Sequence, residues 1–341
     1  MSIVPPYLLD ALERHPSGRV RQAARRTRAI ALREGAASVV SAERAGAGPA
    51  VPYRIVFDCR HEIKLPGVLV RRERQRTTGD IDVDRAYRMA GETLDFYSTV
   101  LGRNSVDDRG MPVASTVHYG TRFQNAFWNG AQMVYGDGDG EIFGSFTTCL
   151  EVAAHELTHG VSDTDVGLAY KGESGALSES ISDVFGSLVK QRSLRQSAAG
   201  ADWLIGAGIF GPAIACAGLR SLAAPGTAYD EPLLGGRDPQ PSHMRDLVKG
   251  GSNDHFVHIN SGIPNHAFYL FATALGGNAW EVAGRVWYDA LRSGLDRKCG
   301  FRSFATATVE AAGAHGSRTV SALRGAWHDV GITVPASSCR S

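Results

Sequence analysis

The pattern of apolar and polar residues predicts strands in the first half of the chain and helices in the second. Residues 53–58 (YRIVFD) and 67–73 (GVLVRRE) alternate between apolar and polar side chains, as half-buried strands do. Residues 82–102 follow a helical period, whereas 111–120 and 129–144 are expected to be strands, the latter with a Gly-rich turn. From about residue 150 the pattern is mainly helical, which predicts an α+β architecture.

Composition divides the chain further. Residues 35–52 (GAASVVSAERAGAGPAVP) are small and punctuated by prolines, as is typical of a linker. Residues 10–34 are rich in Ala, Arg and Leu and are expected to be helical. The predicted units are a head, 1–50; a strand-rich lobe, 51–160, ending in a helix with two histidines; and a helical lobe, 161–341.

Charge and apolar runs give little sign of a nucleic-acid or membrane partner, and neither is expected. The net charge of the 341 residues is +1. The first 50 residues hold eight arginines against four acidic residues, a net charge of +4. A basic head could dock electrostatically, although charge alone favours a solvated tail. No apolar run approaches the roughly 18 residues that span a bilayer.

The N-terminus also bears on location. It has no basic region ahead of an apolar stretch, so cytoplasmic synthesis without a secretory signal is expected, with non-classical secretion as an alternative. The cysteines are odd in number and never form a CxxC pair, which fits a reducing compartment. They are Cys59, Cys149, Cys216, Cys299 and Cys339.

The stretch LEVAAHELTHGV (150–161) carries the first chemical motif. His155 and His159 lie four residues apart, so on a helix they share one face and can direct two imidazoles at a single zinc ion. Glu156 lies one position round the helix, where a general base for the attacking water belongs. A polar helix face that matches by chance is the alternative interpretation.

A second predicted helix strengthens the metal interpretation. Glu179 and Asp183 are four residues apart on a face distinct from its apolar stripe. Glu179 can complete a His/His/Glu site with an open fourth position, and Asp183 can accept the second ring N–H of a histidine ligand. The joint pattern therefore favours one catalytic zinc. The stripe consists of Leu177, Ile181, Val184, Phe185 and Leu188.

These residues resemble the thermolysin family of zinc metallopeptidases over about residues 53–333. The similarity includes NAFWNGAQMVYGDGDGEIF, GLAYKGESGALSESISDVFGSLV and VHINSGIPNHAFYL. The head, with PPYLL, resembles the short propeptide of the protealysin branch. Three later segments, GSLVKQ, ADWLIGAG and DPQPSHM, also resemble that branch. The resemblance implies a two-lobed α+β fold with the active site between the lobes.

By position, the resemblance implies a role for each candidate residue. His155, His159 and Glu179 would bind zinc, Glu156 would be the base, and Tyr170 and His258 would stabilise the oxyanion. Asn125, Ala126 and Trp128 would hold the substrate backbone, and Arg220 the carbonyl beyond the cleavage point. An apolar pocket would select bulky hydrophobic residues after that point, although core packing is an equal alternative for its members. They are Phe143, Phe146, Val152, Ile205, Ile209 and Leu219.

Some positions depart from the family pattern. Asn253 stands where an aspartate usually orients the catalytic histidine, and Asp254 follows one residue later. Ser178 stands where an asparagine commonly supports the second zinc-binding histidine. Glu151 and Asp202 match calcium ligands, but Lys190 and Ala207 replace two acids, so no double calcium site is expected and a single calcium stays an alternative.

The head is expected to inhibit the enzyme. Pro5 and Pro6 stiffen the chain, which lowers the entropy cost of docking Tyr7, Leu8 and Leu9 in an apolar groove. Removal is expected between Glu43 and Tyr53, and a disordered tail is the alternative.

The sequence thus predicts a zinc-dependent neutral endopeptidase made as a self-inhibited precursor. Its expected partners are peptide or protein substrates and its own propeptide, with a proteinaceous inhibitor as a further candidate. A catalytically silent zinc-binding fold and a hydrolase of small amides are the alternatives. Glu156 argues against the first, because a structural site needs no base, and NAFW against the second, because an edge strand suits long peptides.

Overall fold

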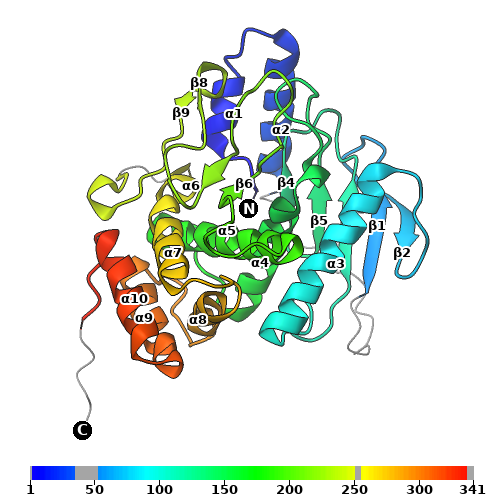
Figure 1. The fold of residues 1–341 in the computed structure, drawn as a ribbon. Coiled ribbons are helices and arrows are strands. Elements are labelled where there is room, and N and C mark those ends of the chain that lie inside the picture. The colour runs from blue at the N-terminus through cyan, green and yellow to red at the C-terminus, as the bar shows by residue number, and fades with distance from the viewer. Residues whose placement is uncertain (1, 35–52, 250–254, 336–341) are drawn as a thin grey trace.

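The computed structural model describes residues 2–34, 53–249 and 255–335, whose arrangement Figure 1 shows. The head contains α1 (Pro6–Leu12) and α2 (Gly18–Glu34). The strand-rich part contains β1 (Arg54–Asp58), β2 (Val68–Arg72), α3 (Ile81–Leu101), β3 (Val113–Val117), β4 (Ala126–Trp128), β5 (Gln132–Tyr135) and α4 (Leu150–Asp165). The helical part contains α5 (Gly172–Leu194), β6 (Leu204–Ile205), β7 (Arg220–Ser221), β8 (Asp230–Glu231), β9 (Gly236–Arg237), α6 (His255–Asn260), α7 (Gly262–Leu275), α8 (Val282–Leu291), α9 (Phe301–Ala312) and α10 (Ser317–Asp329).

A five-stranded sheet, in the order β2-β1-β3-β5-β4, forms the first lobe. The strands predicted from alternation are confirmed. β1, β3 and β5 run parallel, whereas β2 and β4 pair antiparallel with their neighbours. Because β4 ends the sheet, no strand of the described residues pairs with its outer edge, which can accept an extended peptide.

Helix α3 packs against this sheet, as its helical period predicts. The Asp80 side chain caps it by accepting the N–H groups of Asp82 and Val83, and Gly102 ends it in the left-handed conformation. The apolar residues Ala86, Met89, Leu94 and Phe96, which lie within the predicted helix, are all buried.

Helices α4 and α5 pack closely at the centre of the molecule (Figure 1). A Cβ on Gly186 of α5 would lie 2.6 Å from the backbone oxygen of Glu151 in α4, so glycine allows the close approach. The predicted apolar stripe of α5 is buried, but so are all residues from 174 to 191. The prediction of one buried apolar face is therefore incomplete, because neighbouring elements cover every side of this helix.

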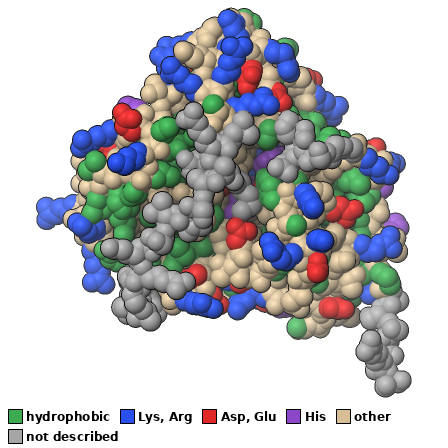
Figure 2. Space-filling model, turned by 180° about the vertical axis from the view of Figure 1, so that it is seen from behind, with side chains coloured by type: hydrophobic (Ala, Val, Ile, Leu, Met, Phe, Trp, Pro, Cys, Tyr) green, Lys and Arg blue, Asp and Glu red, His purple; other side chains and the backbone are tan. Residues whose placement is uncertain are grey.

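The head forms two helices rather than one over residues 10–34. α1 ends at Leu12, and α2 starts after Pro16, whose ring cannot continue a helix. α2 buries Val20, Ala23, Ala24 and Thr27, while its opposite face exposes arginines. Figure 2 shows Lys and Arg side chains gathered at the top of the molecule, where Figure 1 places this head. The packed face of α2 thus consists of apolar and small side chains.

Two sequence expectations concern the chain as a whole. Among the described helices, none is long and apolar enough to cross a membrane. The four cysteines within the described ranges are free, and Cys339 lies outside them.

Candidate metal centre and substrate cleft

Two histidines of α4 face each other across a short gap. The Nε2 atoms of His155 and His159 lie 3.1 Å apart, and both side chains are fully buried. One helical turn separates the residues, so the rise of the helix brings the rings to the same point.

Glu179 of α5 reaches the same point. Its carboxylate oxygens lie 3.5 Å from the Nε2 atoms of His155 and His159. The three residues can each offer a ligand atom within 4.8 Å of the others, which is the set predicted from the sequence. Two imidazole nitrogens and one carboxylate that converge in a buried site fit zinc.

A buried network of charged and polar side chains holds the ring of His155 in position. Its Nδ1 lies 2.8 Å from Asp183 Oδ1, as predicted for an outer partner. Arg220 donates to both carboxylate oxygens of Asp183 at 2.8 Å, and Asn265 Nδ2 donates to Oδ2 at 2.9 Å. Although burial opposes ionisation, Arg220 and His155 hold the pKa of Asp183 below its usual range. Asn265 has no sequence signal that distinguishes it from other asparagines.

Hydroxyl groups support His159 instead of a carboxylate. Ser182 Oγ lies 3.0 Å from His159 Nδ1, and the predicted supporter Ser178 lies 3.4 Å from the same atom. Sequence analysis missed Ser182, although it lies three residues after Glu179 and therefore on the same face of α5.

Glu156 follows His155 in the chain, but its carboxylate contacts β4 and is not one of the three possible metal ligands. Its Oε2 accepts the N–H of Trp128 in β4 at 3.0 Å, whereas Oε1 has no hydrogen-bond partner within the described ranges. Burial raises the pKa of Glu156 to about 7. A carboxyl group with a pKa near neutrality suits a proton acceptor.

Tyr170 and His258 meet on the other side of the metal ligands. Tyr170 Oη donates to Glu179 Oε1 at 2.5 Å and lies 3.1 Å from His258 Nε2. His258 Nδ1 lies 3.0 Å from Glu179 Oε2. The two predicted oxyanion-binding groups are therefore close to the metal group. The predicted partners Asn253 and Asp254 lie outside the described residues.

The predicted substrate-binding residues contact the start of the head. Ile3 donates its N–H to the Ala126 carbonyl at 3.1 Å, and Arg220 Nη1 donates to the Ile3 carbonyl at 3.0 Å. Asn125 brackets Val4, accepting its N–H at 2.9 Å and donating to its carbonyl at 3.3 Å. Sequence analysis had singled out Pro5, Pro6, Tyr7, Leu8 and Leu9, which lie just beyond; Leu8 and Leu9 are buried.

The six residues predicted to line an apolar pocket are all buried, in one hydrophobic cluster with Ile3. Their burial does not decide whether these residues line a substrate pocket or belong to the core. Ile3 of the head lies among them, and a head residue that filled a pocket would bury its lining in the same way. They are Phe143, Phe146, Val152, Ile205, Ile209 and Leu219.

At the positions where the resemblance implies calcium ligands, this chain holds an ammonium group. Lys190 Nζ lies 2.8 Å from Asp202 Oδ1 and 3.5 Å from Glu151 Oε1, and it donates to the Leu204 carbonyl at 2.7 Å. The N–H groups of Gly206 and Ala207 also donate to Glu151. A cation that is part of the chain already neutralises these oxygens, so they do not fit a double calcium site.

A second group of possible metal ligands comprises Asp80, Asp82 and His118. Here the ring of His118 bridges two carboxylates, with Nδ1 2.9 Å from Asp137 and Nε2 3.1 Å from Asp80. Asp82 accepts hydrogen bonds from Ser145 and Thr147. The side chains therefore already satisfy one another, and an ion-paired cluster explains them.

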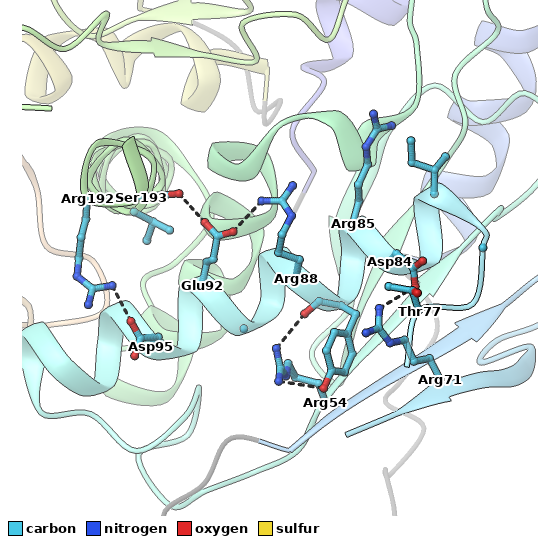
Figure 3. Close-up of a pocket in the computed structure, with 15 residues that line it drawn as sticks. Arg54, Arg71, Thr77, Asp84, Arg85, Arg88, Glu92, Asp95, Arg192 and Ser193 are labelled. Carbon is cyan, nitrogen blue, oxygen red and sulfur yellow. Dashed lines mark hydrogen bonds and ion pairs between the residues drawn. The ribbon is translucent and has the colours of Figure 1, made fainter. Parts of the chain in front are cut away.

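A surface hollow of about 950 Å³ runs along α3, away from the metal group. Figure 3 shows several of its arginines paired with acidic side chains, among them Arg192 with Asp95 and Arg71 with Asp84. None of the predicted site residues lines this hollow. Its pairs join α3 to the sheet and to α5.

A buried His/His/Glu group beside a separate buried glutamate, between a sheet and a helical lobe, defines a metal-dependent hydrolase. Residues 56–163 match the model of the thermolysin metallopeptidase catalytic domain, and residues 166–332 match that of its α-helical domain. An extracellular metalloprotease of Pectobacterium carotovorum subsp. carotovorum is 48% identical, covering 98% of this chain and 96% of that protein. Protease PrtS of Photorhabdus sp. (strain Az29) is 47% identical over 83% of this chain and 77% of its own.

A solved structure gives the same result. The precursor of protealysin, a metalloproteinase from Serratia proteamaculans, has a TM-score of 0.90 and 46% identity, covering 98% of this chain and 100% of that one. The chain therefore belongs to the thermolysin family of zinc metallopeptidases. This confirms the expectation of a zinc-dependent peptide hydrolase, and the alternative of a silent binding fold has no support among these relatives.

Proposed function

We propose that this chain is the self-inhibited precursor of a zinc endopeptidase that cleaves peptides before bulky hydrophobic residues. The observation that carries the proposal is the seating of Ile3 and Val4 on Asn125, Ala126 and Arg220, beside the metal group. A head that occupies the groups expected to hold a substrate excludes that substrate by competition.

The proposed mechanism assigns each step to residues of this chain. Zinc, held by His155, His159 and Glu179, would supply Lewis-acid chemistry. Glu156 would take a proton from the attacking water and pass it to the leaving nitrogen. Tyr170 and His258 would donate hydrogen bonds to the oxyanion that develops on the substrate.

Substrate selection follows from the cleft. An extended peptide would lie along the outer edge of β4, with its backbone held by Asn125, Ala126 and Arg220. The residue after the cleaved bond would enter the cluster that now surrounds Ile3, which is fully buried. Burial of apolar area, about 25 cal/mol per Å², would favour large aliphatic and aromatic side chains there.

Activation would require removal of the head, residues 1 to about 50, by cleavage between Glu43 and Tyr53. That interval lies in residues 35–52, outside the described ranges. We also propose that the enzyme acts outside the cell, because the Pectobacterium relative is named an extracellular metalloprotease.

Casein hydrolysis tests the proposal. The wild type, once its linker is cut, should hydrolyse casein and lose this activity when a zinc chelator is added. Glu156→Gln, which keeps the shape of the side chain but cannot accept a proton, should be inactive. Equal and chelator-insensitive hydrolysis by both proteins would contradict the proposal.

A further inference from the structure

The first residues of the head bind the cleft in a single register. The two backbone groups of Ile3 are both held, its N–H by the Ala126 carbonyl and its carbonyl by Arg220. The two backbone groups of Val4 are both held by the Asn125 side chain. Four backbone hydrogen bonds over two consecutive residues leave no freedom to slide by one position, because a slip would unpair all of them.

Two independent links place the bond before Ile3 at the reactive groups. Ala126, which accepts the Ile3 N–H, lies two residues from Trp128, whose N–H holds Glu156. Two residues along a strand span about 7 Å, so the Ile3 nitrogen and the Glu156 carboxylate both contact the same short stretch of β4.

The second link runs through Arg220. Its guanidinium joins the Ile3 carbonyl to Asp183, and Asp183 contacts the ring of His155, a metal ligand. Arg220 is the group expected to hold the substrate carbonyl beyond the cleavage point. Because the Ile3 carbonyl lies on Arg220 and the Ile3 nitrogen contacts β4 next to Glu156, Ile3 is the first residue after that point, and Ser2–Ile3 is the bond in position for cleavage.

Resting on the proposed function, we propose that the enzyme hydrolyses its own Ser2–Ile3 bond while the head stays bound. The oxygen of a water molecule adds to the Ser2 carbonyl carbon, and the bond from this carbon to the Ile3 nitrogen breaks. Glu156 carries a proton from the water to that nitrogen. The products are a peptide ending in the Ser2 carboxylate and a head beginning with the free amine of Ile3, so water is the only co-reactant.

Trimming does not itself release the head. All four backbone hydrogen bonds are made by Ile3 and Val4, on the retained side of the cut. The packing of α1 and α2 also lies on that side. The cut therefore converts a bound substrate into a bound product, and it is separate from cleavage of the linker.

The N-terminus of the full chain, determined by intact mass and N-terminal sequencing before the linker is cut, tests the inference. Wild-type precursor should begin at Ile3, whereas Glu156→Gln precursor should keep Ser2. Active enzyme added to Glu156→Gln precursor should leave Ser2–Ile3 intact, because the docked head shields it from other molecules.

Three results would overturn the inference: wild type that retains Ser2, wild type that begins at another residue, or trimming of the Glu156→Gln precursor by added enzyme. Casein hydrolysis separates this failure from that of the proposed function. An enzyme that cuts its linker and digests casein but retains Ser2 would refute the trimming alone.

Discussion

Arg220 donates to the carbonyl of Ile3 at 3.0 Å while it holds both carboxylate oxygens of Asp183. One guanidinium thus connects the head to the network behind a metal ligand. All these side chains are almost completely buried, so the head is bound where solvent screening is weak.

Ile3→Asp should therefore weaken inhibition. An ionised carboxylate buried at this position without a partner costs several kcal/mol, and each 1.4 kcal/mol is about tenfold in affinity. The uncut precursor should then hydrolyse a short peptide at least about tenfold faster than the wild-type precursor. Ile3→Leu, which keeps an apolar side chain of the same volume, is the control and should stay inhibited. Equal inhibition in all three precursors would show that Ile3 does not anchor the head.

Lys190 should replace calcium as a source of stability. Calcium at millimolar concentration should leave the Tm of the wild type unchanged. Lys190→Met leaves Glu151 and Asp202 without their cation and should cost about 2–4 kcal/mol of unfolding free energy, discounted because Asp202 is partly exposed. Lys190→Glu should make the Tm rise when calcium is added.

The exposed Lys298 supplies a matched control, since Lys298→Met removes the same charge without a buried partner. Thermal unfolding with and without calcium provides the measurement. A wild-type Tm that rises with calcium would contradict this account of Lys190.

Ser182→Ala should lower zinc affinity by about 10- to 100-fold, because the hydroxyl fixes the orientation of the His159 ring. Ser180→Ala is the control: Ser180 is also buried in α5, and its hydroxyl has no hydrogen-bond partner in the described part of the chain. Competition with a chromogenic zinc chelator measures both. Equal zinc affinities for the two variants would exclude a positioning role for Ser182.

His118 should make stability depend on pH. The hydrogen bond to Asp137 and the contact with Asp80 raise the pKa of His118 to about 9. Because the pKa is raised in the folded state, the stabilisation is complete below about pH 6.5, the ordinary histidine value, and is lost as pH rises through about 9. After allowance for solvent screening, the loss should be about 1–2 kcal/mol.

Urea unfolding of the wild type and His118→Gln at pH 6 and pH 9.5 measures this effect. The neighbouring His61, which lies 3.2 Å from Asp137, is present in both proteins and so acts as an internal control. The difference in unfolding free energy between the two proteins should shrink at the higher pH. A difference that stays constant would refute the ion-pair explanation.

Some elements of the fold could be predicted from the sequence and others could not, and the difference has physical causes. Periodicity predicted α3, because its apolar residues are buried along one face. It also predicted β1 and β2, although each strand has only one buried residue. It described α5 poorly, because that helix is buried all round. Spacing within one helix predicted the pair His155 and His159, because positions four apart share one face, and Glu179 was predicted from the second helix as the ligand that completes the site.

The sequence pattern did not predict contacts between segments that are far apart in the chain. Val4 and Asn125 are 121 residues apart, and Ile3 and Arg220 are 217 apart. Nothing in the residues MSIV predicts these contacts, whereas the prolines that follow form a recognisable motif. Ser182 and Asn265 were missed because common residues acquire their roles only from what the fold places beside them.

The central claim is that Glu156 activates water at a zinc ion that it does not bind. Zinc content per chain, measured together with casein hydrolysis for Glu156→Gln and Glu179→Gln, tests it most directly. We predict that Glu156→Gln keeps one zinc and loses activity, whereas Glu179→Gln loses both. A Glu156→Gln protein that hydrolyses casein, or that fails to retain zinc, would contradict the account.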